Sequence, residues 1–200
     1  MKSLVTGFDP FGGDAINPSY EAVRCLPSCI ASRSGTLEVV TAVLPTSFRR
    51  ATTTLRALIR REQPDIVLCV GLAADRTAIS VERVAVNLDD ARLPDNDGAC
   101  PRDKPVVRGG PAAYFSALPV RKIVTRLAAE NIPCELSMSA GAFVCNHVFY
   151  ALMHLAARRE QRLQAGFVHV PALSALSLEQ MVRGLTLVLE VTRRSMTARR

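Results

Sequence analysis

Hydrophobic and polar positions follow two patterns along this chain of 200 residues. Short apolar runs of strand length are separated by longer segments whose apolar residues recur at the spacing of a helix. The runs that predict strands are residues 2–6, 37–44, 66–71, 80–87, 134–137 and 165–170. The segments that predict helices are residues 18–26, 47–61, 120–130, 146–157 and 178–195.

This alternation predicts the fold class. Strands separated by helices are typical of α/β proteins, and the nearly continuous apolar run 66–71 is typical of a strand covered on both faces. We therefore expect a single catalytic or binding domain over residues 1–200, built as a three-layer α/β/α sandwich with a largely parallel, mixed central sheet. In such folds, functional side chains gather beyond the carboxyl ends of strands.

Two segments depart from the alternation. Residues 89–119 are rich in Asp, Pro and Gly and predict a long irregular excursion, which in a compact domain is usually functional or disordered. The arginine-rich segment 193–200 predicts a frayed basic tail in solvent.

Composition narrows the class of protein. The net charge of +7 raises nucleic acid as a partner, but the basic residues are spread out and the chain has no Trp and three Tyr to stack on bases. We therefore expect no nucleic-acid partner. No run of about 18 apolar residues predicts a membrane-spanning helix, and residues 1–7 do not resemble a signal peptide. These features indicate a cytoplasmic protein.

One of the six cysteines has a different setting from the others. Cytoplasmic thiols stay reduced, and the cysteine spacings contain no paired zinc-type motif, so we expect neither disulfides nor a metal site. Cys69 lies in a buried strand pattern and is interpreted as a small hydrophobic residue. Cys145 instead follows the small residues 139–142 where an apolar helix begins, a position that lowers a thiol pKa and favours the reactive thiolate. A buried structural cysteine is the alternative for Cys145 taken alone.

A nucleophilic thiol needs a base, and the chain has three histidines. His147 lies two residues after Cys145, so the two side chains point to opposite sides of a helix, and His154 lies more than two turns away. His169 stands near the end of a predicted strand that Pro171 closes. By elimination, His169 is the best candidate for the base, with a structural histidine as the alternative.

The acceptor that would orient this imidazole stays open at this level. The acidic candidates are Asp75, Glu82, Asp89, Asp90, Asp95 and Asp97. Glu82 lies inside a strand pattern, an unusual place for a charge unless it faces a sheet edge or a site.

Phe8 and Phe11 stand out in the glycine-rich loop 6–13, because the chain has only ten aromatic residues. They either pack beneath the loop or form an apolar wall for a small flat ligand. The loop matches neither nucleotide-binding glycine motif.

Several segments together resemble the pyroglutamyl peptidase I family, also called the pyrrolidone-carboxylate peptidases. The matching segments are residues 6–13, 17–19, 71–74, 81–87, 89–96, 139–147 and 168–171. They keep the family's order and cover nearly the whole chain, so the combination is far more specific than any single motif.

The resemblance implies a cysteine peptidase that removes N-terminal pyroglutamate from peptides, through a catalytic triad of Cys145, His169 and Glu82. It further implies a cytoplasmic homotetramer with an α/β/α fold and no metal or cofactor. The residues that it assigns to substrate binding are Phe8, Phe11, Arg92 and Phe143.

The chain departs from the family pattern at two places. Asp75 stands where the family usually has glycine, and residues 172–176 replace a proline-rich segment that contains tyrosine. These differences bear on the ring pocket and on subunit contacts. Two other functions stay open: a cysteine amidase that acts on another small acyl group, and a non-catalytic binding protein with the same fold.

Overall fold

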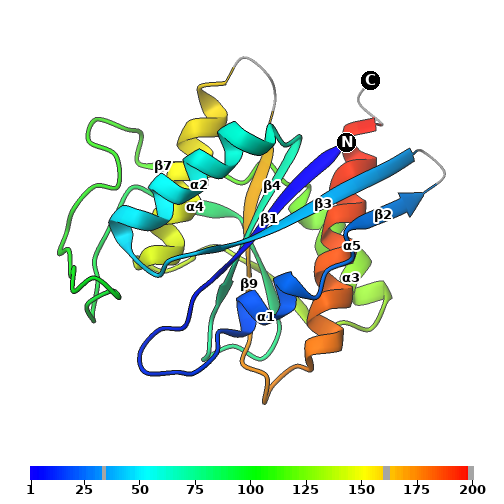
Figure 1. The fold of residues 1–200 in the computed structure, drawn as a ribbon, viewed down its shortest axis with the longest axis horizontal. Helices are drawn as coiled ribbons and strands as arrows, with labels where there is room; N and C mark the ends of the chain where they lie inside the picture. Colours follow the sequence, from blue (N-terminus) through cyan, green and yellow to red (C-terminus); the bar gives the residue numbers. More distant parts are fainter. Residues whose placement is uncertain (33–34, 160–162, 198–200) are drawn as a thin grey trace.

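A mixed central sheet organises the molecule (Figure 1). The computed structural model describes residues 1–32, 35–159 and 163–197, and within them the sheet has seven strands in the order β2-β3-β1-β4-β9-β5-β8. β1, β3, β4 and β9 are mutually parallel, β2 is antiparallel to β3, and β5 is antiparallel to β9. The strands are β1 (Lys2–Phe8), β2 (Cys29–Ser32), β3 (Gly35–Leu44), β4 (Ile66–Leu72), β5 (Ile79–Glu82), β8 (Cys134–Ser137) and β9 (Gln164–Val170).

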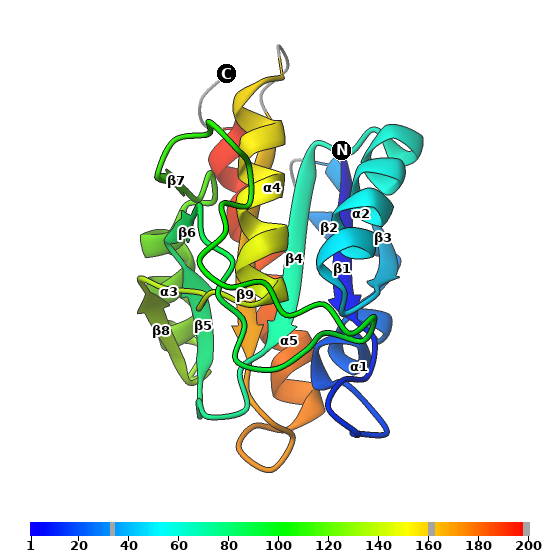
Figure 2. The same cartoon turned by 90° about the vertical axis from the view of Figure 1, so that its left-hand side faces the viewer.

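Helices cover both faces of this sheet. The helices are α1 (Pro18–Arg24), α2 (Phe48–Glu62), α3 (Val120–Ala129), α4 (Val144–Ala157) and α5 (Leu178–Thr197). α2 and α4 lie on one face, and α1, α3 and α5 lie on the other (Figures 1 and 2). Neighbouring strand residues alternate between the two cores, so that Leu4 packs beneath α2 and α4 while Val5 packs on the opposite side. The predicted α/β/α sandwich with a mixed sheet is confirmed.

Local signals explain where the first two helices begin. Asn17 caps α1 by accepting a hydrogen bond from the Ser19 N–H, and Pro18 occupies the first helical position. Ser47 caps α2 by accepting a hydrogen bond from the Arg50 N–H. Asn17 directly precedes the predicted helix 18–26, whereas Ser47 is the first residue of the predicted helix 47–61, so the second helix begins one residue later than predicted.

The predicted strand 80–87 is two strands in the structure. β5 ends at Glu82, and β6 (Val84–Val86) leaves the main sheet to pair with β7 (Ala113–Phe115) from the excursion. Asn146 on α4 holds β6 in place, because its side chain bonds both the N–H and the carbonyl of Val86. The excursion 89–119 is therefore irregular only in part. β2 was not predicted, because its four residues show no clear alternation.

The frayed basic tail expected from residue 193 is not observed over residues 193–197, which continue α5. Arg193 is 1% exposed, and its guanidinium donates a 2.7 Å hydrogen bond to the carbonyl of Gly35. This contact docks the end of the helix against the start of β3. Residues 198–200 of the expected tail lie outside the described residues.

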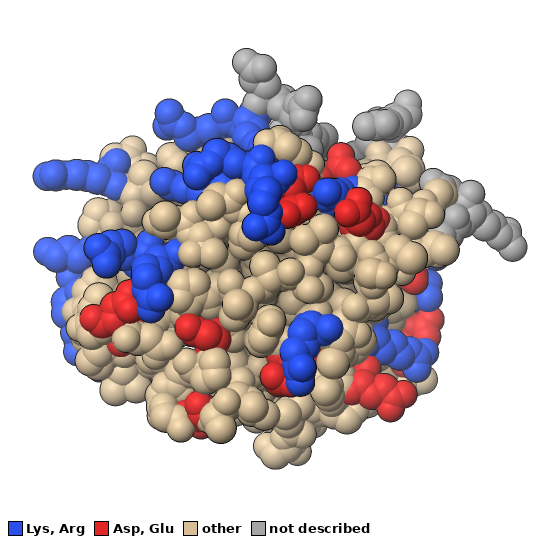
Figure 3. Space-filling view, in the orientation of Figure 1, with Lys and Arg blue, Asp and Glu red and all other residues tan. Residues whose placement is uncertain are grey.

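Basic side chains gather on the side of the molecule occupied by α2 (Figure 3). That helix carries five arginines, of which Arg50 and Arg61 form ion pairs with Asp97 and Glu62. Acidic side chains are therefore mixed into the basic surface. Within the described ranges, no helix is both long and apolar enough to span a bilayer, and no cluster of three or more His, Cys, Asp or Glu side chains is arranged to hold a metal ion.

Candidate active site

The alternation of β4 and β9 brings Gly71 and His169 side by side beneath α4. Cys69 and Phe167 point into the core under α2 and α4. Gly71 comes two residues after Cys69, and His169 comes two residues after Phe167, so both lie on the same face of the sheet as those core residues. The two residues are also direct partners in the parallel register of β4 and β9. The carboxyl ends of these two central strands therefore present an imidazole beside a position with no side chain.

β5 supplies a carboxylate to the same face. Val81 packs in the opposite core, so the neighbouring Glu82 points towards α4. His169 Nδ1 lies 2.8 Å from Glu82 Oε1, and Arg76 Nη1 donates to the same oxygen over 2.7 Å. Glu82 is fully buried and His169 is 4% exposed. The structure thus brings together two of the predicted site residues.

The environment of Glu82 favours its ionised form. Burial opposes the charge, but the hydrogen bond and charge of His169, together with hydrogen bonds from Ser137 and Arg76, outweigh burial and lower the pKa of the Glu82 carboxyl. An ionised carboxylate is the acceptor that fixes a histidine tautomer with the proton on Nδ1, leaving Nε2 free to accept a proton.

Cys145 is the second residue of α4 and lies directly above the carboxyl ends of β4 and β9. A methyl group placed on Gly71 would come within 2.8 Å of Cys145 Sγ, so the absence of a side chain at Gly71 makes room for the sulfur. Because Gly71 is the register partner of His169, the thiol lies over the strand position next to the imidazole.

The surroundings of Cys145 favour the neutral thiol, whereas its place at a helix start led us to expect a lowered pKa. Burial raises the pKa of Cys145 to about 12, nearby Glu82 and Cys69 raise it too, and Arg76 lowers it. Loss of solvent and a neighbouring carboxylate both disfavour a thiolate. A base must therefore remove the proton for the sulfur to react.

Aromatic side chains enclose the space in front of the thiol. Cys145 lines a hollow of about 100 Å³ together with Phe8, Phe11 and Phe143. The ring centroids of Phe11 and Phe143 lie 5.1 Å apart. The structure therefore brings three of the four predicted substrate-binding residues to the thiol.

Arg92 lies in a second, outer groove rather than in this hollow. The outer groove has a volume of about 530 Å³ and shares Phe11 and Phe143 with the inner hollow. The Arg92 side chain is exposed to solvent. The remaining residues that line the groove are Val86, Leu88, Asp90, Leu93, Ser139, Gly141 and Ala142.

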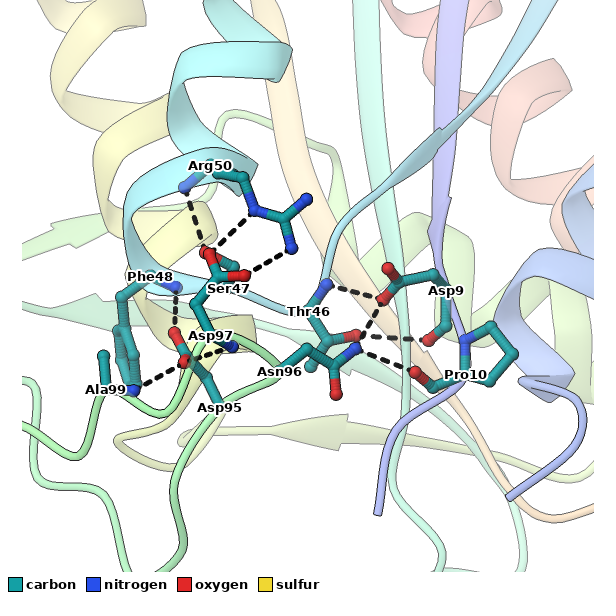
Figure 4. A network of polar contacts seen from close by, with 10 residues as sticks. All are labelled: Asp9, Pro10, Thr46, Ser47, Phe48, Arg50, Asp95, Asn96, Asp97 and Ala99. Carbon is teal, nitrogen blue, oxygen red and sulfur yellow. Dashed lines mark hydrogen bonds and ion pairs between the residues drawn. The ribbon is translucent and has the colours of Figure 1, made fainter. Parts of the chain in front are cut away.

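A polar network fixes the loop that carries Phe8 and Phe11 (Figure 4). Asp95 accepts hydrogen bonds from the first N–H of α2 and from two N–H groups of its own turn. The Asn96 side chain donates to the carboxylate of Asp9 and to the carbonyl of Pro10. Asp97 accepts two hydrogen bonds from Arg50, over 2.7 and 2.6 Å. The excursion is thereby tied to the first loop and to the start of α2.

The other two histidines have partners away from the thiol. His147 Nδ1 lies 2.8 Å from Asp89 Oδ2, and its ring packs edge-on against Phe48. His154 Nδ1 lies 2.9 Å from the hydroxyl of Tyr114. Neither is arranged to serve Cys145, in keeping with the choice of His169 by elimination.

Sequence reasoning missed Arg76. A glutamate buried in a strand needs compensating donors, and that requirement was a signal to search nearby loops for a cation. Arg76 lies six residues before Glu82 in the loop between β4 and β5, where no periodic pattern marks its direction.

A thiol at a helix start, above a buried histidine–carboxylate pair, is the arrangement of a cysteine hydrolase site. Comparison with known proteins identifies the family within that class. The family model described as pyroglutamyl peptidase matches residues 1–198. The chain belongs to the pyroglutamyl peptidase family, a family of cysteine peptidases, and the resemblance named from its motifs is confirmed.

Individual relatives match over nearly the whole chain. The pyrrolidone-carboxylate peptidase of Thermosipho melanesiensis is 46% identical over 195 residues, which cover 92% of this chain and 95% of the relative. The crystal structure of Bacillus amyloliquefaciens pyroglutamyl peptidase I is 40% identical, with a TM-score of 0.91 and 96% of each chain covered. A mutant pyrrolidone carboxyl peptidase from the hyperthermophile Pyrococcus furiosus is 38% identical, with a TM-score of 0.93, 98% of this chain and 100% of that chain covered.

Proposed function

We propose that this protein hydrolyses the bond that follows an N-terminal pyroglutamyl residue in peptides, with Cys145 as nucleophile, His169 as base and Glu82 as the group that orients His169. The observation that carries the proposal is the buried Glu82–His169 pair. His169 on β9 is the direct register partner of Gly71 on β4, the glycine that lies beneath the thiol. Membership of the pyroglutamyl peptidase family supports the substrate class.

The high pKa of the thiol defines the first step. A thiol with a pKa of about 12 carries almost no thiolate at neutral pH, so His169 accepts the proton as Cys145 Sγ attacks the pyroglutamyl carbonyl carbon. The carbon–sulfur bond forms while the carbonyl electron pair moves to oxygen. The first N–H groups of α4 have no acceptor within the helix and stabilise this oxyanion.

The remaining steps return the proton and release both products. The carbon–nitrogen bond breaks, and protonated His169 gives its proton to the departing amine, leaving a thioester on Cys145. His169 then removes a proton from a water molecule that attacks the thioester carbonyl. The carbon–sulfur bond breaks, pyroglutamate leaves, and the sulfur takes the proton back from His169. Glu82 stays ionised throughout and stabilises the imidazolium.

The two hollows suit the two halves of such a substrate. The pyroglutamyl ring is a small flat lactam without an ammonium group, and the inner hollow of about 100 Å³ offers the rings of Phe8, Phe11 and Phe143 to it. The outer groove begins at the same two rings, Phe11 and Phe143, and receives the residues that follow. Arg92 contacts the substrate from this groove.

Release of aminocoumarin from pyroglutamyl-aminocoumarin tests the proposal. We expect turnover with this substrate and at least tenfold lower kcat/KM with prolyl-aminocoumarin, whose ammonium group would enter an apolar hollow. Cys145→Ala abolishes release. An acetyl or other small acyl substrate that is cleaved faster than pyroglutamyl would favour a different amidase. A wild-type protein that cleaves none of the panel would contradict an enzymatic role.

The proposal includes a cytoplasmic location and a homotetramer. Free thiols throughout the described residues support a reducing compartment. Large exposed apolar side chains, including Phe115 and Met138, support contact with further copies of the chain. Light scattering on the purified protein tests the assembly: four times the monomer mass is expected at micromolar concentration, and a monomer or dimer would contradict it.

A further inference from the structure

We propose that Arg76 is a positioning residue, which holds Glu82 as the acceptor of His169 and braces the loop in front of Cys145. The proposal rests on the roles proposed above for Glu82, His169 and Cys145. Arg76 does not touch the hollow in front of the thiol, so it acts through Glu82 and through the loop rather than on substrate.

The guanidinium of Arg76 joins two parts of the site. Nη1 donates over 2.7 Å to Glu82 Oε1, the oxygen that also lies 2.8 Å from His169 Nδ1. Nη2 donates over 2.9 Å to the carbonyl of Ser139. Ser139 opens the short loop that leads into α4 and Cys145. One planar side chain therefore fixes the distance between the acid and the loop that carries the nucleophile.

The charges around Glu82 show what Arg76 compensates. His169 faces the carboxylate from β9, Arg76 from the loop before β5, and Cys145 from α4. On β8, Glu135 lies 3.9 Å from Arg76 and accepts a hydrogen bond from Ser80. Arg76 is thus the permanent cation beside a fully buried carboxylate, since His169 is charged only when protonated.

Removal of that cation changes the protonation of the whole site in one direction. Without Arg76, the negative charge of Glu82 is unshared, and every neighbouring group holds its proton more tightly. The pH at which the site becomes active is therefore expected to rise. Arg76 also lowers the pKa of Cys145, so its loss raises the pH at which the sulfur reacts.

The pH profile of kcat/KM tests the proposal through Arg76→Gln, with Arg83→Gln as the matched control. Arg83 is the residue after Glu82 and carries the same charge, but its guanidinium lies over the ring of Phe115, 5.0 Å from the centroid. In Arg76→Gln, we expect the acid limb to move to higher pH by about one unit. The limb stays in place in Arg83→Gln. An unmoved limb in Arg76→Gln, or an equal shift in both variants, would overturn the proposal.

Arg76→Lys separates charge from geometry and serves if the glutamine variant does not fold. Lysine keeps the cation but cannot bond Glu82 and the Ser139 carbonyl in the fork geometry of a guanidinium. The expected result is an acid limb at the wild-type pH with kcat reduced several-fold. A shifted limb in Arg76→Lys would contradict the electrostatic part, and an unchanged kcat would contradict the bracing of the loop.

Alkylation of Cys145 by iodoacetamide, followed by mass spectrometry of its peptide, requires no substrate. In Arg76→Gln, the rate profile moves to higher pH, while Arg83→Gln follows the wild type. If the wild type fails to cleave pyroglutamyl-aminocoumarin but this shift is seen, the proposed function fails and the role of Arg76 stands. If the alkylation profile does not move, the role of Arg76 fails whatever the hydrolysis assay shows.

Discussion

Among the described residues, two histidine–carboxylate pairs have the same contact distance. His169 and Glu82 are joined by an Nδ1–Oε1 contact of 2.8 Å, and His147 and Asp89 by an Nδ1–Oδ2 contact of 2.8 Å. Both pairs are largely buried, with side-chain exposures of 5% and 0% for the first and 14% and 8% for the second. By contact distance alone, they would be equally good candidates for a catalytic base and its partner.

The surroundings of the two pairs differ, and this difference distinguishes a candidate catalytic pair from a pair with a structural role. His169 lies on a strand next to the glycine beneath the thiol, and Arg76 compensates its carboxylate. His147 lies on the helix of the nucleophile but packs against Phe48, and Asp89 exchanges two backbone hydrogen bonds with Lys104. The second pair therefore ties the excursion to α4. A histidine–carboxylate bond becomes a catalytic candidate only through what its second ring nitrogen can reach.

Replacement of each histidine by alanine gives the largest expected contrast. His169→Ala removes the proposed base, and we expect kcat/KM for pyroglutamyl-aminocoumarin to fall about a thousandfold or more. His147→Ala leaves the base in place, so kcat stays within about tenfold of wild type while the thermal midpoint falls. Equal losses of kcat in the two variants, with both folded by circular dichroism, would erase the distinction between the pairs.

Gly71→Ala tests whether the place of the thiol beside His169 matters. The added methyl would lie 2.8 Å from Cys145 Sγ and 2.9 Å from the Phe167 ring, so the sulfur must move. A displacement of this size is expected to lower kcat about a hundredfold. Gly184→Ala is the matched control, because its methyl would press on the flexible end of Ile79 in the opposite core. Wild-type kcat in Gly71→Ala would show that the sulfur does not work from this position.

Much of this contrast was accessible from the sequence. The strand ending at Pro171, and the two-residue separation of Cys145 from His147, are local patterns. They selected His169, which the structure places beside Glu82 and next to the glycine beneath the thiol. Local patterns could not choose Glu82 among six acids, because β5 and β9 meet only when a sheet with crossovers has formed. The family resemblance supplied that choice.

The rest depended on long-range packing. The pKa of Cys145 was expected to be low because a helix start is visible in sequence, whereas the burial that raises it is not. Arg76 reaches Glu82 and Ser139 through a loop without periodicity. The end of α5 was mistaken for a solvated tail because its arginines suggest exposure, yet Arg193 is buried against Gly35.

Glu82→Gln sharpens the comparison at the carboxylate of the first pair. The amide still fills the space but no longer stabilises an imidazolium, so kcat is expected to fall about ten- to a hundredfold, less than in His169→Ala. Because the folded-state pKa of Glu82 lies below its ordinary 4.5, its charge stabilises the fold above that pH, and this contribution is lost as the pH falls through the lowered pKa. The free energies of unfolding of the wild type and of Glu82→Gln, measured in urea, should therefore converge below about pH 4. An unchanged kcat would remove Glu82 from the mechanism.

Asp89→Asn, at the carboxylate of the second pair, is expected to have the smallest effect on turnover. An amide oxygen still accepts a hydrogen bond from His147, but the bond loses its ionised acceptor, which costs about 1–2 kcal/mol of folding stability. Asp89 is flanked by Leu88 and Asp90, which line the outer groove, so loosening the excursion raises KM a few-fold for peptides and leaves kcat near wild type. Steady-state kinetics with a pyroglutamyl dipeptide and with pyroglutamyl-aminocoumarin measures this split. A fall in kcat as large as that of Glu82→Gln would mean that the pair at His147 takes part in the chemistry, and that the surroundings of the two pairs do not separate their roles.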